Sequence, residues 1–197
     1  MRLFVAMDIP EEVRAAVAAL VERLRSTNIP AGSKQSPHPG GRWARIEGLH
    51  VTLKFIGEVP EEKLGPIVSA LKDVVFAKPI AFRFRGLGFF PNERRPRVLW
   101  AGIDSGPELA AFAAAVETAL IPLGIAREDR AFSPHLTLAR FDSPRDLERL
   151  HTAIEAAGPL EFGSTIAKEF HLYQSILKRG GAEYTRVATF ACAGSES

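Results

Sequence analysis

The hexapeptide His-Val-Thr-Leu-Lys-Phe at residues 50–55 has a near copy, His-Leu-Thr-Leu-Ala-Arg, at residues 135–140. Successive side chains of a β-strand point to opposite faces, so each copy would place its aliphatic residues on one face and its histidine and threonine on the other. His50 and Thr52 would then lie side by side on a strand with an apolar back, and His135 and Thr137 would do the same. The sequence therefore predicts an imidazole and a hydroxyl, held together, in each half of the chain.

Internal repetition gives this pattern its significance. A single His-x-Thr in a strand is more often structural than functional. This chain has only five histidines, however, and two of them occupy matched positions in a duplicated motif. Strict alternation also places Lys54 on the face of His50, where we expect it to contact either substrate or solvent.

The composition is that of an ordinary globular protein. Hydrophobic residues make up 46% of the 197 residues and charged residues 24%, and the net charge is +2. This mildly basic balance favours an anionic partner without identifying one. The one cysteine, Cys192, excludes an internal disulfide and a cysteine-based metal cluster. Since the sequence has neither a long apolar run nor a signal-peptide pattern, we expect a cytoplasmic protein with no membrane partner.

The order of helical and strand patterns predicts an α+β protein. We expect residues 1–197 to form a single two-lobed domain with one His-x-Thr motif per lobe, each lobe being a mostly antiparallel sheet with helices outside. A pseudo-twofold axis between the lobes would make the two motif strands face each other across a central cleft. The expected strands are residues 2–8, 43–46, 50–57, 80–84, 98–103, 135–140, 162–177 and 182–192, and helices are expected to open near residues 10, 60, 105 and 143.

Two facing imidazoles suggest acid–base chemistry at phosphorus. Histidine is the side chain most easily poised as acid or base near neutral pH, so one ring can accept a proton from water or a hydroxyl while the other gives one to the leaving oxygen. In-line displacement at phosphorus needs these two roles on opposite sides of the phosphate. The threonine hydroxyls can donate hydrogen bonds to the non-bridging oxygens, and a nearby arginine would add charge-assisted bonds.

Paired His-x-Thr-x motifs in a chain of this length resemble the two-histidine phosphoesterases. In particular, they resemble the bacterial and archaeal RNA 2′,3′-cyclic phosphodiesterases, also called the 2′-5′ RNA ligase family. The likeness extends nearly from end to end of the chain. The similar segments are residues 2–10 (RLFVAMDIP), 49–57 (LHVTLKFIG), 130–140 (RAFSPHLTLAR) and 170–184, in which Phe170, Leu172, Tyr173, Ser175 and Tyr184 match.

This resemblance implies a bilobal fold with a central cleft and no metal cofactor. It implies that a terminal 2′,3′-cyclic phosphate is opened to a 2′-phosphate, and some members of the family join RNA halves through a 2′-5′ linkage. By the same resemblance His50 would be the proton donor and His135 the proton acceptor, while Thr52 and Thr137 would hold the phosphate.

Two arginines are further candidates for phosphate contacts. Arg140 matches a family arginine near the phosphate, but strict alternation would place it on the face opposite His135, so a bulge or the end of the strand must redirect it. Arg130 is a second candidate. The implied partner is RNA with a 2′,3′-cyclic phosphate end, with tRNA fragments among the possible substrates, and we expect a monomer.

Other interpretations stay open from the residues alone. The chain could be an RNA-binding module without catalysis, or a related phosphoesterase for a small cyclic nucleotide. A metal site built from His50 and His135 lacks acidic companions within either hexapeptide. Residues 83–97 combine arginines with Phe84, Phe89 and Phe90, and this segment either cradles single-stranded RNA or is a charged strand face followed by a loop.

Overall fold

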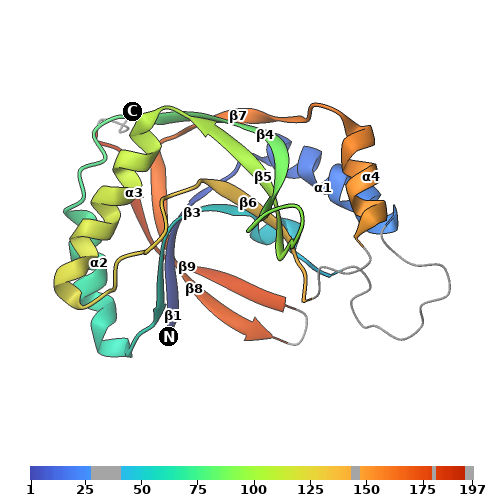
Figure 1. The fold of residues 1–197 in the computed structure, drawn as a ribbon. Coiled ribbons are helices and arrows are strands. Elements are labelled where there is room, and N and C mark those ends of the chain that lie inside the picture. The colour runs from blue at the N-terminus through green and yellow to red at the C-terminus, as the bar shows by residue number, and fades with distance from the viewer. Residues whose placement is uncertain (28–40, 143–146, 179–180, 194–197) are drawn as a thin grey trace.

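Two β-sheets and four α-helices make up the computed structural model of the chain, which describes residues 1–27, 41–142, 147–178 and 181–193 (Figure 1). In chain order the elements are β1 (Arg2–Asp8), α1 (Glu11–Thr27), β2 (Arg42–Trp43), η1 (Ile46–Gly48), β3 (His50–Glu58), η2 (Glu61–Lys63), α2 (Leu64–Lys72), β4 (Ile80–Phe90), β5 (Val98–Ser105), α3 (Pro107–Leu120), η3 (Ile121–Leu123), β6 (His135–Arg140), α4 (Glu148–Ala157), β7 (Glu161–Ala167), β8 (Glu169–Lys178) and β9 (Gly181–Ala191).

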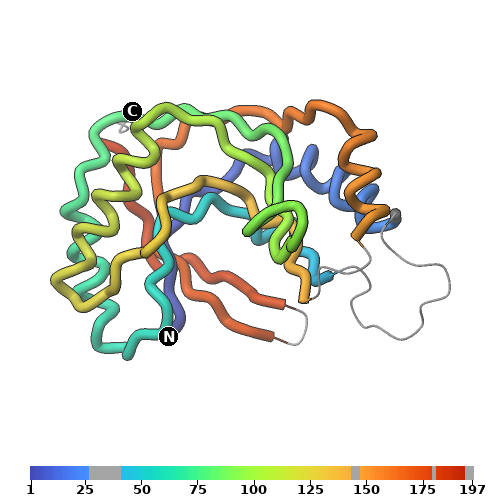
Figure 2. The backbone as a smooth tube through the Cα atoms, viewed as in Figure 1, coloured from blue at the N-terminus to red at the C-terminus, as the bar shows by residue number. Residues whose placement is uncertain are grey.

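Both sheets are antiparallel, and each contains one motif strand. The first sheet, called sheet A below, has the strand order β3-β1-β8-β9, and the second, sheet B, has the order β2-β6-β5-β4-β7. The motif strands β3 and β6 contact each other where the two sheets meet (Figure 2). The expectation of an α+β fold with two antiparallel sheets and helices outside is confirmed.

The helices are exchanged between the two sheets. α1 follows β1 of sheet A in the chain but packs against β7 of sheet B, beside α4. Conversely, α3 follows β5 of sheet B but packs against β3 of sheet A, beside α2. Figure 1 shows these two helix pairs at opposite ends of the molecule. Each half of the chain thus supplies a helix to the sheet begun by the other half.

Apolar periodicity explains where the helices form. α1 buries one stripe of side chains at helical spacing, and Glu11 and Glu12 occupy its first turn, where the helix dipole favours negative charge. Pro66 delays the start of α2: residues 61–63 form a 3₁₀ turn, and the α-helix begins at Leu64, so the proline lies in its first turn. The buried stripe of α1 consists of Val13, Val17, Leu20, Val21 and Leu24.

Some expected elements differ in the structure. The expected strand over residues 162–177 is two strands, because the chain leaves sheet B after Ala167 and enters sheet A at Glu169. β4 continues to Phe90 through an irregularity between Phe84 and Leu87, where a break was expected. Trp43 belongs to a strand of only two residues, and α4 begins at Glu148; the expected helix opening at residues 143–144 lies outside the described residues.

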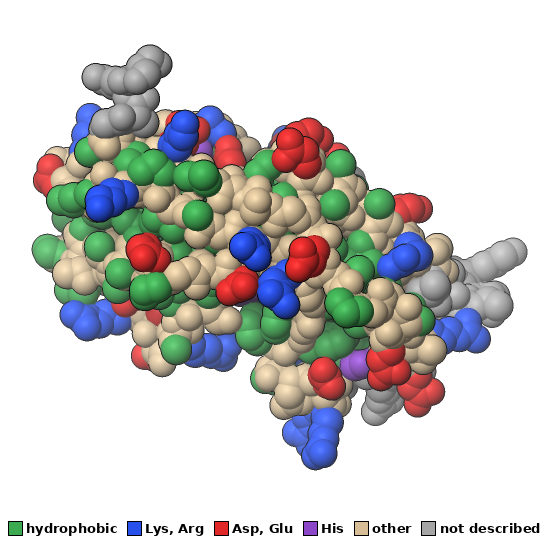
Figure 3. All heavy atoms as spheres, turned by 90° about the horizontal axis from the view of Figure 1, so that it is seen from above, with side chains coloured by type: hydrophobic (Ala, Val, Ile, Leu, Met, Phe, Trp, Pro, Cys, Tyr) green, Lys and Arg blue, Asp and Glu red, His purple; other side chains and the backbone are tan. Residues whose placement is uncertain are grey.

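The buried side chains form one continuous cluster that includes residues of both sheets. Seen from above, the surface carries basic and acidic side chains interspersed among hydrophobic ones (Figure 3). Among the described helices, none is both long and apolar enough to cross a membrane.

Candidate active site

A β-bulge in the first motif strand changes which way its side chains point. Val5 of β1 pairs with Lys54 and Ala6 pairs with Thr52, so Leu53 is an extra residue without an opposite partner. One extra residue reverses the alternation beyond it. As a result Leu53 and Lys54 are both buried.

The prediction that Lys54 shares a face with His50 is therefore wrong. Its side chain is turned into the protein and is only 3% exposed. The ammonium donates to Glu117 Oε1 of α3 at 2.6 Å and to the carbonyl of Ala126 at 2.7 Å. Lys54 thus links the buried face of β3 to α3. Its buried charge is paired with the Glu117 carboxylate, as a buried charge requires.

The second motif strand has a bulge at the matching position. Leu99 of β5 pairs with Ala139 and Trp100 pairs with Thr137, which leaves Leu138 as the extra residue. Arg140 is thereby turned to the face of His135 and Thr137, and it is exposed. The expectation that a bulge or the strand end must redirect this arginine is met by the bulge. In the first motif the same position is occupied by Phe55, which is 53% exposed.

Both histidines are anchored through the same ring nitrogen. His50 Nδ1 lies 2.7 Å from the carbonyl oxygen of Gly48, and His135 Nδ1 lies 2.7 Å from the carbonyl oxygen of Ser133. A carbonyl oxygen only accepts hydrogen bonds, so Nδ1 must hold the proton in each ring. This leaves Nε2 of each histidine as the atom that can accept or donate a proton.

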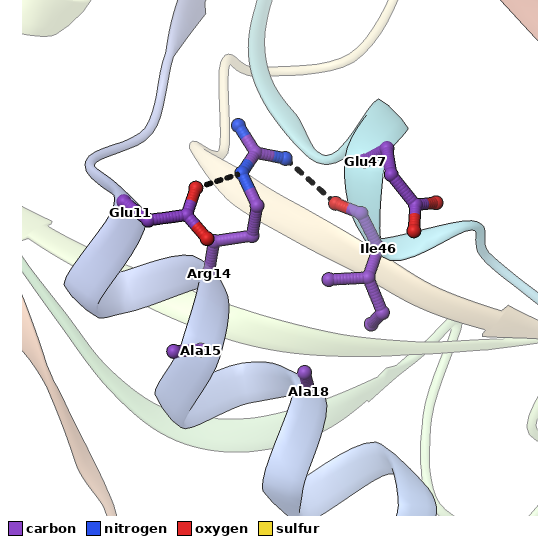
Figure 4. A pocket seen from close by; sticks show the side chains of 6 residues that line it. All are labelled: Glu11, Arg14, Ala15, Ala18, Ile46 and Glu47. Atoms are coloured by element: carbon purple, nitrogen blue, oxygen red, sulfur yellow. Dashed lines mark hydrogen bonds and ion pairs between the residues drawn. The ribbon is translucent and has the colours of Figure 1, made fainter.

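The turn that holds His50 is fixed by the first helix. Arg14 of α1 donates from Nη1 to the carbonyl of Ile46 at 2.7 Å and pairs through Nε with Glu11 at 3.2 Å (Figure 4). A hollow of about 400 Å³ lies between α1 and η1. Figure 4 shows the small side chains of Ala15 and Ala18 on its helix side. Arg14 therefore holds η1 against α1, and the carbonyl of Gly48, the last residue of η1, accepts the hydrogen bond from His50.

Charges of opposite sign lie near the two histidines. Burial lowers the pKa of His50, while its hydrogen bond to Gly48 and the carboxylate of Asp8 act in the opposite direction, and His135 lowers it further. Asp8 is the residue paired with His50 across β1 and β3. Burial also lowers the pKa of His135, where the hydrogen bond to Ser133 raises it but the nearby guanidinium of Arg140 lowers it.

Asp8 itself is held by residues from the other end of the chain. The Tyr173 hydroxyl donates to Asp8 Oδ1 at 2.5 Å, and the guanidinium of Arg186 pairs with Oδ2. Burial, together with the hydrogen bond to Asp8, raises the pKa of Tyr173 to about 12, so this phenol stays protonated and donating. His171 is buried behind this group, with Nδ1 3.0 Å from the Thr189 hydroxyl.

These side chains were missed as site residues at the level of sequence. Asp8 and Tyr173 were noted only as points of resemblance, and Arg186 was not singled out. Asp8 is an acidic residue directly after five apolar residues of β1, which is the one local signal that could have identified it. Its partners are far along the chain, and only the sheet order β3-β1-β8-β9 brings them together.

The other predicted site residues occupy different environments. Thr52 and Thr137 are half-buried, each on the face of its own histidine. Arg130 is exposed in the segment that precedes β6. Aromatic rings pack against both histidines: Phe4 stacks on His50 with ring centroids 4.6 Å apart, and Phe90 meets His135 edge-on at 5.0 Å.

A pocket of about 510 Å³ opens beside His50. Its walls come from β1, α1, η1, the start of β3 and the paired strands β8 and β9, and they combine aromatic, basic and acidic side chains. It is lined by Asp8, Arg14, Arg45, Glu47, Gly48, Leu49, His50, Tyr173, Ala182, Glu183, Tyr184 and Arg186.

Two further interpretations of the sequence were a metal site at His50 and His135 and an RNA-binding face in residues 83–97. Across the described part of the chain, no group of three or more histidine, cysteine or acidic side chains is placed to hold a metal ion. In residues 83–97, Phe84 and Phe89 are buried in the core, so of the three phenylalanines only Phe90 is near the surface. Arg85 of this segment pairs with Asp104 at 3.6 Å.

Comparison with known proteins identifies the family of the chain. The model of the 2′-5′ RNA ligase superfamily matches residues 9–176, which is most of the chain. The chain therefore belongs to the 2′-5′ RNA ligase superfamily, as its paired motifs indicate.

Similar proteins cover nearly the whole chain. The RNA 2′,3′-cyclic phosphodiesterase of Archaeoglobus fulgidus is 35% identical over 190 residues, which are 96% of this chain and 99% of that protein. The one from Thermus thermophilus is 36% identical over an alignment of 201 positions, which covers 98% of this chain and 91% of the relative. Among solved structures, a protein of Thermus thermophilus superposes with a TM-score of 0.76 at 33% identity, covering 99% of this chain and 100% of the other. E. coli LigT complexed with 3′-AMP reaches 0.74 at 27% identity, covering 98% of each chain.

Proposed function

We propose that this chain hydrolyses the 2′,3′-cyclic phosphate at the end of an RNA to a 2′-phosphate, with His50 as general acid and His135 as general base. The observation that supports this most directly is the duplicated anchor. Each histidine is fixed through Nδ1 to a backbone carbonyl two residues earlier, on contacting strands, with a threonine on the same face. Relatives over most of the chain are named for this activity.

The reaction moves two protons and breaks one P–O bond. A water oxygen attacks phosphorus while Nε2 of neutral His135 takes a proton from that water. The bond from phosphorus to O3′ breaks, and O3′ receives the proton from Nε2 of protonated His50. The products are a 2′-phosphate and a free 3′-hydroxyl. The two rings have then exchanged protonation states and return to their starting states by proton exchange with solvent.

The charges near each ring support this assignment of roles. An acid must be protonated before reaction, and the carboxylate of Asp8 favours protonated His50. A base must be neutral, and the guanidinium of Arg140 favours neutral His135. Thr52, Thr137 and Arg140 supply donors to the non-bridging oxygens, whose charge must be stabilised during displacement. Arg130 is close in sequence to this group and remains a candidate for a more distant phosphate.

The same geometry suits ligation. If an RNA 5′-hydroxyl replaces water as the nucleophile, His135 takes the hydroxyl proton, O3′ leaves as before, and the product is a 2′-5′ phosphodiester. Fragments of tRNA are candidate substrates. We propose that residues 1–197 act as one two-lobed domain in which each lobe contributes one motif. A monomeric state and a cytoplasmic location stay predictions from the sequence.

The alternatives make different demands on the site. A module that only binds RNA has no need for two histidines with matched tautomers and free Nε2 atoms. A phosphoesterase for a small cyclic nucleotide would use the same chemistry, and it differs only in preferring a mononucleotide to an RNA end.

Product analysis tests the proposal. A short oligonucleotide ending in a 2′,3′-cyclic phosphate is incubated with the protein in a chelator, and the product is identified by mass spectrometry and by its mobility beside 2′- and 3′-phosphate standards. A 2′-phosphate product in the chelator is expected. An unreacted substrate, or activity that the chelator abolishes, would contradict it. A higher kcat/KM for the 2′,3′-cyclic mononucleotide than for the oligonucleotide would select the small-molecule alternative.

A further inference from the structure

Three arginines gather where the second motif strand ends. Arg42 of β2 pairs directly with Arg140, the last residue of β6. Arg97 immediately precedes β5, the strand on the other side of β6. Residues directly opposite each other in an antiparallel pair point to the same face, so Arg42 lies on the face of Arg140, which is also the face of His135. A second guanidinium therefore stands beside the one that we assign to the reacting phosphate.

We propose that Arg42 and Arg97 bind a phosphate of the RNA strand whose 5′-hydroxyl replaces water in ligation. This inference rests on the proposed function and adds to it a site for the attacking strand. Nothing in the hydrolysis of a cyclic phosphate requires these two arginines, because the attacking molecule is then water. The ligand of the site is a phosphodiester of single-stranded RNA.

The proposed reaction determines which strand lies at this cluster. The attacking oxygen approaches phosphorus in line with the leaving O3′ and from the opposite side, which is the side of His135. An attacking strand continues from its 5′-oxygen through the first ribose to its first internucleotide phosphate. With Arg140 at the reacting phosphate, the neighbouring Arg42 is placed for that next phosphate on the same side.

The charges of the cluster leave room for an anion. Arg42 Nη2 pairs with Asp142 Oδ1 at 2.7 Å, while Arg97 donates to the main-chain carbonyl of Asp142. In the described part of the chain, no carboxylate pairs with Arg97 or Arg140. Like charges on directly opposite residues of a strand pair destabilise it, and an anion between them relieves the repulsion.

The bond between Arg42 and Asp142 can be exchanged for one to phosphate. The side chain of Arg42 is 60% exposed and that of Asp142 is 79% exposed. Exposed ion pairs of this kind contribute little stability, so the pair opens at small cost. A guanidinium can bind a phosphate through two parallel charge-assisted hydrogen bonds. Asp142 therefore acts as a weak competitor that holds Arg42 until RNA arrives.

Gly41 fixes how closely the backbone before Arg42 approaches β6. Its φ of +107° is a conformation that residues with a side chain rarely adopt. A Cβ at this position would lie 2.5 Å from the ring of Phe141 and 2.9 Å from the carbonyl oxygen of Arg140. The glycine thus allows the close contact with β6 that brings Arg42 beside Arg140.

A ligation assay tests the site. One oligonucleotide ends in a 2′,3′-cyclic phosphate and another begins with a 5′-hydroxyl, and gel electrophoresis measures the joined and the hydrolysed products of one reaction. We expect Arg42→Gln to lower the ratio of ligation to hydrolysis about 10-fold, the effect of one lost charge-assisted bond. Arg97→Gln should lower the ratio in the same direction. Asp142→Asn should raise it about 3-fold, because the competing carboxylate is gone.

The ratio separates the attacking strand from the cleaved one. Arg149→Gln makes the same change of charge on the exposed face of α4 and serves as the matched control. If Arg42→Gln lowers both rates and leaves their ratio unchanged, the cluster holds the strand that is cleaved, and the inference is overturned. A ratio and rates equal to those of Arg149→Gln would overturn it as well.

A binding measurement decides the case without turnover. Adenosine 2′-phosphate, the kind of product that hydrolysis would leave, is added at saturation, and fluorescence anisotropy follows a 3′-labelled oligonucleotide with a 5′-hydroxyl. Its Kd should rise about 10-fold in Arg42→Gln and fall about 3-fold in Asp142→Asn. Equal Kd values in the wild type and both variants would refute the site. If no cyclic phosphate is opened, the proposed function fails, and the anisotropy comparison still decides whether the cluster binds RNA.

Discussion

β3 and β6 share a backbone design but differ in charge. Both strands contain a bulge at the fourth residue of the motif, and both anchor the histidine through Nδ1 to a carbonyl. Beyond the bulge the first strand exposes Phe55 where the second exposes Arg140, and the first strand pairs His50 with Asp8. A duplicated scaffold can therefore supply two identically anchored rings, while unlike neighbours give the rings different electrostatic environments.

Loss of either histidine should have the largest effect. We expect His50→Ala and His135→Ala to lower turnover by at least ~100-fold each, the usual contribution of one general acid or base. The two variants should differ in their pH profiles: residual activity of His50→Ala loses its alkaline limb, and that of His135→Ala loses its acid limb. Steady-state rates on an oligonucleotide with a 2′,3′-cyclic phosphate, with circular dichroism to verify folding, measure both. Near-normal turnover would remove that histidine from the mechanism.

Arg140 and Phe55 occupy matching positions and should differ in importance. Arg140→Gln is expected to lower kcat/KM roughly 10- to 100-fold, because it removes a charge-assisted bond to the phosphate. Since Arg140 lowers the pKa of His135, its loss should also move the acid limb to higher pH. Phe55→Ala should change kcat/KM less than about 3-fold, as should Arg149→Gln on the exposed face of α4. An equal loss in Phe55→Ala would mean that the two positions act alike.

The back faces of the motif strands also differ, since Lys54 is buried where the second strand has Ala139. Glu117→Ala should lower the free energy of unfolding by about 2 kcal/mol, because it leaves the buried ammonium of Lys54 without its carboxylate partner. Lys54→Met should cost less, because Glu117 can turn to solvent. Urea unfolding measures the free energy of unfolding of both variants. Equal decreases in the two variants would contradict the cost assigned to the unpaired ammonium.

The same pair should respond to acid. The hydrogen bond from Lys54 lowers the pKa of Glu117. A lowered folded-state pKa gives stability that is present above the unfolded pKa, near pH 4.5, and is lost as pH falls through the folded value. Glu117→Ala should therefore differ most from the wild type above that pH and converge with it in stronger acid, as urea midpoints across the acid range would show.

The smallest expected change is a shift of one limb of the pH profile. Burial lowers the pKa of both histidines, so the bell-shaped profile of kcat/KM should lie to the acid side of pH ~6.5, the ordinary histidine value. Asp8→Asn removes a charge that favours protonated His50, so the alkaline limb should move to lower pH while the acid limb stays in place. A rate that rises steadily to pH ~10 in the wild type would contradict the paired histidines. An alkaline limb that is unmoved in Asp8→Asn would remove Asp8 from the tuning of His50.

Sequence patterns predicted the parts of the site that depend on neighbouring residues. Period-two alternation places Thr52 beside His50 without any knowledge of the fold. A bulge, by contrast, is defined by the partner strand, so nothing local marks Leu53 or Leu138 as the extra residue. Lys54 was misplaced for that reason, and the position of Arg140 needed the bulge to be explained.

The remaining site residues depend on topology. Asp8, Tyr173 and Arg186 meet only because β8 pairs with β1 and β9 pairs with β8, which a single sequence does not reveal. The same holds for residues 162–177, where the apolar pattern continues through the point at which the chain changes sheets. The pattern records that residues are buried, and it does not record which sheet buries them.

The exchange of α1 and α3 between the sheets has a consequence for motion. A hinge needs a boundary that the backbone crosses only a few times, so that one body can swing about a few bonds. Here the chain passes repeatedly between sheet A with its helices α2 and α3 and sheet B with its helices α1 and α4. The crossings run from β1 to α1, from β2 to β3, from α2 to β4, from β5 to α3, from α3 to β6 and from β7 to β8. A swing of one half would have to bend all of these connections at once. The connectivity therefore opposes a hinge motion that would change the separation of β3 and β6, the strands that carry the two histidines.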